Sequence, residues 1–483
     1  MPFVNRRREL ASLERFWSSG RAECIPVVGR RRVGKTYLLE SFATGKRCVY
    51  YRCQLKSSSE QLPQLGADLA RISEDPVLQA EPPRTWPAIF ALIERLAERE
   101  RLLLVIDEVP YWTARDESLP STLQNWWDAR GRTLDLMLVL CGSAVQMMEK
   151  LLTGDAPLAG CITGRLVVRP FDFRAASELL RFPDPLDSLT AYGILGGVPL
   201  YLTFFQPNRS IHANILEAIA SPTARLYVEP QAVFAAHHGS YDAQQALSVL
   251  RAIARRQHQW SDIIRETGLS ATQLSRVMEP LVGDLGLVER VLPVTEVKPS
   301  RTYFTQYHLT DNFFRFWFQF VEPNQGRIEF GDAERVVDDV ISRLPEYMGL
   351  PFEAMCRDWA RAASGARVLP VSASWLGSWW DADNQVDVVG LDEEKHVIIT
   401  GECKWQNHSF TWDDLQRYLG HVRALGPRVR PDALHLLFAK SGFADNVRQW
   451  AIGTRARLLT PGTLLASFDP ATDPTILRDD LHP

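Results

Sequence analysis

The chain has 483 residues, of which 46% are hydrophobic and 23% charged, so an ordinary globular composition is spread over a length that predicts several separate cores. The net charge of −4 excludes a protein that binds nucleic acid through a general basic field. Seven scattered cysteines, no signal-peptide pattern and no 18-residue apolar run predict a cytoplasmic protein with neither a disulfide framework nor membrane contact.

Short apolar runs dominate residues 1–170 and predict the buried parallel strands of an α/β domain. Runs of four to eight apolar residues without polar alternation suit strands that are covered on both faces. Pro26 removes one ladder hydrogen bond, so we expect the first strand to be irregular there. The expected strands lie at 24–28, 48–51, 102–107, 136–143 and 165–170.

A glycine-rich segment with the pattern GxxxxGK[ST] follows the first of these strands and precedes a helical stretch. Its glycines let backbone N–H groups turn toward phosphate, Lys35 can neutralise the β and γ phosphates, and Thr36 can place its hydroxyl on Mg²⁺. The pattern therefore predicts an ATP and Mg²⁺ site. Its residues are Gly29, Arg30, Arg31, Arg32, Val33, Gly34, Lys35 and Thr36.

Two acidic residues end the apolar run LLLVIDEV, and they complete this expected site. Asp107, at the strand end, is the expected metal ligand, and Glu108 is the expected catalytic residue that orients the attacking water. Ser143 ends a further apolar run, where a small polar side chain either senses the γ-phosphate or caps the strand.

The middle of the chain is predominantly helical. Residues 171–240 are expected to form a helical lid, and residues 241–322 give the helix, helix, helix and hairpin order of a winged helix. Its third helix would offer polar side chains to DNA, but the segment has no basic excess, so protein docking stays an equal alternative. These side chains are Thr272, Gln273, Ser275 and Arg276, and we expect the aromatic run 313–321 to be core.

A second α/β unit is expected over residues 340–483, with a helix at 350–363, strands at 367–373, 384–392, 396–405 and 433–439, and a helix at 411–426. Glu402 and Lys404 point to one face of their strand because side chains alternate. An adjacent antiparallel strand can set Asp387 beside them. We expect Asp387 and Glu402 to bind Mg²⁺, Lys404 to steer or deprotonate water, and Glu353 on the helix to be a further ligand candidate.

The N-terminal motifs resemble the archaeal and bacterial ATPase family within the AAA+/STAND group of P-loop proteins. The resemblance spans roughly residues 1–320 and rests on Phe3, Asn5-Arg6, GRRRVGKT, LLLVIDEV, LVLCGSAVQMME and the GGVP that ends at Pro199. It implies a P-loop ATPase domain over 1–170, with Asn5, Arg6 and Pro199 near the adenine. Arg165 and Arg169 are the candidates for an arginine finger, and a homo-oligomer or a protein partner would be consistent with the group.

The C-terminal order of helix Glu353, strand Asp387 and strand Glu402-Cys403-Lys404, with Gln416 on the next helix, resembles the PD-(D/E)xK nuclease core. It also resembles the domain of uncharacterised function that is often joined to such ATPases. The resemblance implies an ATP-coupled, metal-dependent DNA nuclease. Two alternatives stay open: a non-cutting regulator that binds DNA or protein through a relic nuclease fold, and a complex-assembly ATPase without a nucleic-acid partner.

Overall fold

The computed structural model describes residues 5–235, 243–283, 285–296 and 304–466, and Phe3 of the N-terminal motif lies outside these ranges. The chain divides into two compact units, 1–170 with 283–286, and 171–282 with 287–483, which are described separately. Within the described ranges, no helix has both the length and the apolar character that crossing a bilayer requires. The finer division into four domains stays a prediction.

A five-stranded parallel sheet in the order β2-β3-β4-β1-β5 forms the centre of the first unit. Every residue of β1, β3 and β4 is buried, as the uninterrupted apolar runs predict. Because the strands are parallel, their carboxyl ends share one edge. The strands are β1 (Glu23–Val28), β2 (Cys48–Arg52), β3 (Leu102–Asp107), β4 (Leu136–Gly142) and β5 (Leu166–Val167).

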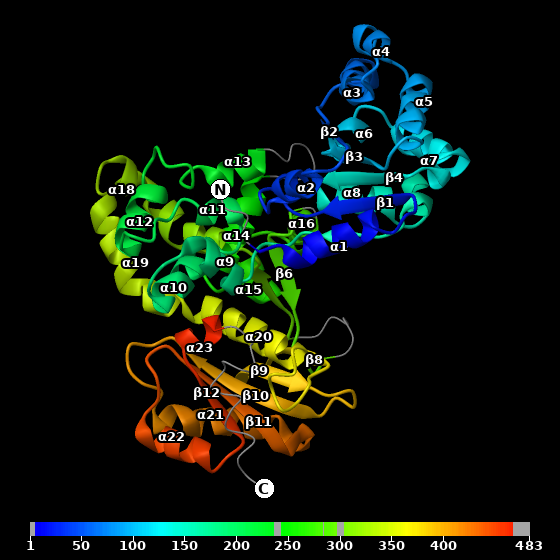
Figure 1. The fold of residues 1–483 in the computed structure, drawn as a ribbon. Coiled ribbons are helices and arrows are strands. Elements are labelled where there is room, and N and C mark those ends of the chain that lie inside the picture. Colours follow the sequence, from blue (N-terminus) through cyan, green and yellow to red (C-terminus); the bar gives the residue numbers. More distant parts are fainter. Residues whose placement is uncertain (1–4, 236–242, 284, 297–303, 467–483) are drawn as a thin grey trace. The chain divides into compact units, whose positions relative to one another are not determined.

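Helices cover both faces of this sheet (Figure 1). Leu13 of α1 and Leu38 and Phe42 of α2 pack on one face, and α3, α5 and α7 supply the core of the other. The main helices are α1 (Arg7–Trp17), α2 (Lys35–Ala43), α3 (Ser58–Ser73), α4 (Pro76–Ala80), α5 (Trp86–Ala97), α6 (Val109–Thr113), α7 (Leu119–Ala129) and α8 (Val145–Leu152).

Pro26 does not disturb β1, so the expected irregularity is wrong. The strand pairs with β4 without interruption, and Pro26 is opposite Leu140. Cys24 and Val28 direct their backbone bonds to the opposite side, toward Thr163 and Val168, so Pro26 faces that side as well. On that side β5 pairs only with Val27 and Val28, so the N–H that Pro26 lacks would have had no strand partner there.

The second unit begins with helices, and a two-stranded antiparallel sheet follows the third of a run of three helices. The aromatic run is core as expected, because Phe313, Phe314, Phe316 and Phe318 are fully buried. The helices are α9 (Phe173–Leu180), α10 (Pro185–Leu195), α11 (Pro199–Leu202), α12 (Ile211–Ala218), α13 (Glu229–Ala235), α14 (Ala243–Ala254), α15 (Trp260–Thr267), α16 (Ala271–Val282), α17 (Asn312–Phe316), α18 (Gln325–Glu329) and α19 (Ala333–Tyr347), and the strands are β6 (Val288–Val291) and β7 (Gln306–Leu309).

A mixed five-stranded sheet in the order β12-β11-β10-β9-β8 closes the described part of the second unit. β10 pairs in parallel with β11 and antiparallel with β9. Helix α20 covers one face, while α21 and α22 cover the other (Figure 1). The elements are α20 (Gly349–Gly365), β8 (Trp375–Trp380), β9 (Gln385–Leu391), β10 (Val397–Lys404), α21 (Trp412–Ala424), β11 (Val429–Ala439), α22 (Asp445–Ile452), β12 (Ala456–Leu459) and α23 (Pro461–Leu465).

The strand expected at 367–373 is wrong, because that segment is irregular and the strand is β8, Trp375–Trp380. Arg367 has a left-handed backbone with φ 58°, and Pro370 cannot donate to a ladder. Both features end regular pairing before the aromatic strand begins.

Candidate functional site

The loop between β1 and α2 is shaped by two glycines. A Cβ on Gly29 would lie 2.3 Å from the carbonyl oxygen of Val168, and Gly34 has φ +91° as the N-cap of α2. Any side chain would clash at the first position, and L-residues rarely adopt the backbone of the second. The loop therefore brings its backbone close to its neighbours and presents the N-terminus of α2, an arrangement suited to an anion.

Lys35 begins α2 and is buried, with 6% of its surface exposed. Its Nζ donates to the carbonyl oxygens of Gly29, at 2.6 Å, and Arg30, at 3.0 Å. Burial lowers the pKa of Lys35, although the charges of Glu108 and Asp107 oppose this shift. The ammonium group is thus held by carbonyl oxygens of the phosphate-binding loop, and phosphate oxygens of a bound nucleotide could replace these acceptors.

Asp107 ends β3 with 1% of its surface exposed. Its Oδ2 accepts from the hydroxyls of Thr36, at 3.1 Å, and Tyr50, at 2.8 Å. Its Oδ1 accepts from the backbone N–H of Glu108 at 3.0 Å. A hydroxyl and a carboxylate oxygen side by side are the hard donors that Mg²⁺ prefers, so this pair fits the expected metal.

Glu108 follows directly with a left-handed backbone of φ 56°. This conformation turns its side chain toward the end of β4, where Oε2 accepts from the hydroxyl and the backbone N–H of Ser143, at 2.8 and 3.2 Å. The structure thus brings together Lys35, Thr36, Asp107, Glu108 and Ser143, five of the residues predicted for the nucleotide site.

Arg6, predicted near the adenine, is buried against the phosphate-binding loop. Its guanidinium donates to the carbonyl oxygens of Val33, at 2.8 Å, and Arg169, at 2.7 Å, and pairs with Glu9. The side chain therefore links the phosphate-binding loop to the segment that follows β5. Asn5 beside it is exposed.

The remaining predicted residues of this site are more dispersed. Arg31 donates to the hydroxyl of Tyr111. Arg165 pairs with Glu149, and the side chain of Arg169 is exposed. Pro199 begins α11 in the second unit, so its place near the adenine stays a prediction.

The C-terminal candidates converge at one end of β9 and β10. Oδ2 of Asp387 accepts from the backbone N–H of Cys403 at 2.9 Å, and Nζ of Lys404 lies 2.5 Å from Oε1 of Glu402. Burial, followed by the charge of Asp387, raises the pKa of both Glu353 and Glu402 to about 8. Burial alone would lower the pKa of Lys404, but the neighbouring Glu402 carboxylate raises the pKa of this lysine above its usual value. These groups therefore share one electrostatic site.

Sequence reasoning missed three neighbours of this site. Gln385 donates to Oδ1 of Asp387 at 3.0 Å, and Arg357 lies 3.6 Å from Glu353. Burial raises the pKa of Asp414, but hydrogen bonds donated by Thr411 at the cap of α21 hold it below the usual value. The charge of Asp414 acts on Glu402 and Lys404. The buried helix position is therefore Asp414, whereas the predicted Gln416 is exposed.

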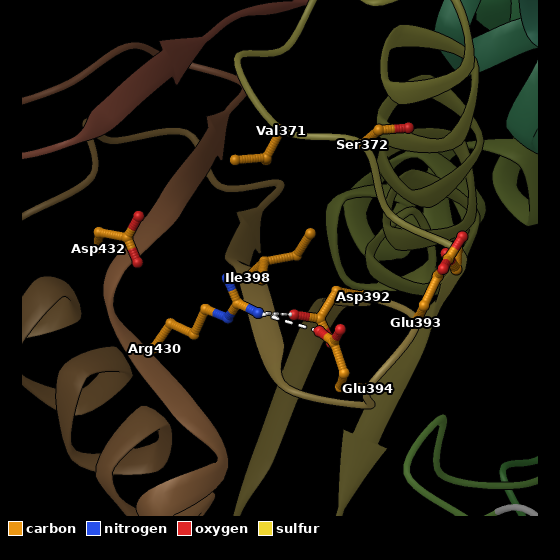
Figure 2. A pocket seen from close by; sticks show the side chains of 9 residues that line it. Val371, Ser372, Asp392, Glu393, Glu394, Ile398, Arg430 and Asp432 are labelled. Carbon is orange, nitrogen blue, oxygen red and sulfur yellow. Dashed lines mark hydrogen bonds and ion pairs between the residues drawn. The ribbon is translucent and has the colours of Figure 1, made fainter.

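A pocket of about 430 Å³ lies near the turn between β9 and β10 (Figure 2). Arg430 reaches into it and pairs with Asp392 at 2.5 Å and Glu394 at 3.2 Å. In the described part of the chain, Asp392, Glu394 and His396 are the group whose ligand atoms lie within 4.8 Å of one another. The arginine already pairs with both carboxylates, so we interpret the group as an ion-pair cluster at the turn.

Comparisons with known proteins match two separate parts of the chain to different families. Residues 3–205 match an ATPase domain found predominantly in Archaea, and residues 317–415 match a family of archaeal and bacterial proteins of unknown function. An uncharacterized protein of Methanocaldococcus jannaschii is 24% identical over 414 residues, 84% of this chain and 88% of its own length.

Two further relatives cover parts of the chain. An uncharacterized ATP-binding protein of the same organism is 51% identical over 45 residues, which is 9% of this chain and 76% of that protein. The Walker-type ATPase of Pyrococcus abyssi has a similar fold, with a TM-score of 0.52 and 19% identity over 66% of this chain and 96% of that one. Residues 3–205 are therefore similar to the ATPase domain found predominantly in Archaea, and residues 317–415 are similar to the archaeal and bacterial family of unknown function.

Proposed function

We propose that the first unit binds ATP with Mg²⁺ and hydrolyses it. The observation that carries this proposal is the contact of Thr36 with Asp107 at 3.1 Å, beside Glu108 and the buried Lys35, at the carboxyl edge of the sheet. Thr36 and Asp107 would hold Mg²⁺, which neutralises charge on the phosphates when it is bound. Lys35 binds the phosphates, and Glu108 orients the attacking water.

The test measures ATP turnover and nucleotide binding of the purified protein, of two site variants and of one control variant. Lys35→Ala should abolish turnover because the phosphates lose their buried cation, while Lys150→Ala, a change at an exposed lysine of the same unit, should leave it intact. Glu108→Gln should keep ATP binding but slow turnover by about two orders of magnitude or more. Unchanged turnover in Lys35→Ala would refute the proposed site.

A second proposal concerns the C-terminal site, which we propose to be a Mg²⁺-dependent nuclease centre acting on DNA. Its support is the convergence of Asp387, Glu402 and Lys404, in which two carboxylates supply hard ligands and an amine lies beside them. The non-cutting alternative keeps the ATP switch and uses the same fold to bind DNA or a protein. Incubation of the protein with plasmid DNA and Mg²⁺ or Mn²⁺, with and without ATP, separates the two.

A further inference from the structure

Strand β2 ends in Arg52, a residue that no motif of the nucleotide site includes. Its backbone is paired directly opposite Asp107 in the parallel register. Its Nε lies 3.6 Å from Oδ2 of Asp107, and its side chain is 60% exposed, against 1% for the aspartate. A solvent-accessible guanidinium therefore lies beside the buried carboxylate that is expected to face the metal.

The position of Arg52 follows from strand geometry. Side chains two residues apart on a strand share a face, so Tyr50 and Arg52 project to the same side as their pairing partners Val105 and Asp107. Thr36 and Tyr50 already hydrogen-bond Oδ2 of Asp107, at 3.1 and 2.8 Å. At 3.6 Å, the contact of Arg52 is longer than a hydrogen bond. Arg52 is thus not needed to fix the carboxylate.

The charges of the site suggest a different partner for this guanidinium. Mg²⁺ at Asp107 would neutralise the carboxylate that now attracts Arg52, while ATP would bring the negative oxygens of its terminal phosphate to the same edge of the sheet. A guanidinium presents a planar fork of donors that fits phosphate oxygens in pairs. Because the Arg52 side chain is exposed, it can move from the carboxylate to a phosphate without disturbing the hydrophobic core.

We propose that Arg52 binds the terminal phosphate of ATP and thereby makes the site prefer ATP to ADP. This inference rests on the proposed ATPase function and names the residue that senses whether the third phosphate is present. Lys35, held within the loop, would bind both nucleotides, whereas Arg52 would have a phosphate partner only in the triphosphate.

The test compares the binding of fluorescent ATP and ADP analogues to the full chain in the presence of Mg²⁺. In Arg52→Gln the affinity for ATP should fall about tenfold or more, the loss of a charged hydrogen bond, while the affinity for ADP should stay within about twofold. Arg52→Lys should lose part of the preference because it keeps the charge but not the fork. Arg71→Gln is the matched control, since Arg71 is an exposed arginine of the same unit that is paired with Asp68.

The outcomes separate this inference from the function on which it rests. Equal changes for ATP and ADP in Arg52→Gln, or no change for either, would overturn the role of Arg52 while leaving the ATPase proposal in place. The ADP affinity also reports whether the variant is folded. Wild-type protein that binds neither nucleotide would refute the ATPase proposal and this inference together.

Discussion

The hydroxyl of Ser143 donates a 2.8 Å hydrogen bond to Oε2 of Glu108, which links the carboxyl ends of the neighbouring strands β4 and β3. The backbone N–H of Ser143 donates to the same oxygen at 3.2 Å. The carboxylate expected to orient water is therefore held by two donors of one residue, and only one of them belongs to the side chain.

Ser143→Ala should consequently weaken the orientation of Glu108 without abolishing it. We expect ATP turnover to fall about tenfold, because one hydrogen bond to a charged group is lost while the backbone donor remains. ATP binding should be unchanged. Ser143→Thr, which keeps a hydroxyl, should retain most of the turnover, and an equal fall in both variants would indicate a packing effect instead.

The buried strands of the first unit could be predicted from the sequence because their patterns are local. β3 matches the predicted range 102–107, and β1 and β4 differ from their predictions by one residue at one end. Such strands are covered on both faces, so hydrophobicity alone marks them. The predicted strand 165–170 shrinks to Leu166–Val167, since an edge strand is defined by its single neighbour.

The nucleotide motifs were also predictable, but the contacts that support them were not. Tyr50 and Arg52 approach Asp107 because β2 pairs with β3, and no local pattern reveals that neighbour relation. Arg6 similarly reaches Val33 across 27 positions of sequence. In the C-terminal site the alternation of side chains placed Glu402 with Lys404, whereas Asp414 is brought there by the packing of α21.

A pair of histidines in ring contact predicts how the stability of the second unit depends on pH. The rings of His258 and His308 lie 4.1 Å apart. Burial lowers the pKa of His258 to about 4 and that of His308 to about 2. The charged groups facing the pair are Arg256, Arg315 and Arg357, with Glu289 opposite His308 in the hairpin.

Both histidines are therefore neutral when folded but take up protons when unfolded below pH about 6.5. The free energy of unfolding should therefore keep its full value above pH about 6.5 and fall as the pH drops toward 4. At pH 5 the loss should be up to about 2 kcal/mol per histidine. Thermal unfolding of the wild type and of His308→Gln at pH 7 and pH 5 measures this slope. The variant should lose less stability on acidification, and parallel curves would contradict the assignment.

Arg276 on α16 tests whether the helical segment before β6 binds DNA. Its side chain is exposed, as are those of Thr272, Gln273 and Ser275. If this face contacts duplex DNA, Arg276→Glu should weaken binding and reduce the salt dependence by about one phosphate contact or more. Gel-shift titrations at several salt concentrations measure both quantities. Arg265→Glu, an exposed arginine on α15, is the matched control, and equal effects of both changes would indicate nonspecific charge attraction.

The C-terminal site allows the most demanding prediction, because metal binding and cutting can be separated there. Asp387→Asn and Glu402→Gln each remove a hard oxygen ligand, so each should abolish both Mg²⁺ binding in calorimetry and cutting of plasmid DNA. Lys404→Ala should keep the metal but lose cutting, because it removes the amine that steers the water or stabilises developing charge. The exposed Glu393→Gln in the same unit should change neither measurement.

These variants should leave ATP hydrolysis intact, because their residues belong to a different unit from the nucleotide site. Their turnover therefore checks that the first unit of each protein is folded, and circular dichroism checks the whole chain. Should the wild type bind no divalent metal at this site and leave DNA and RNA intact under every nucleotide condition, the nuclease proposal fails. Glu353 and Glu402 would then be buried and largely protonated, as their raised pKa values already permit, and the protein would act as a non-cutting ATP switch.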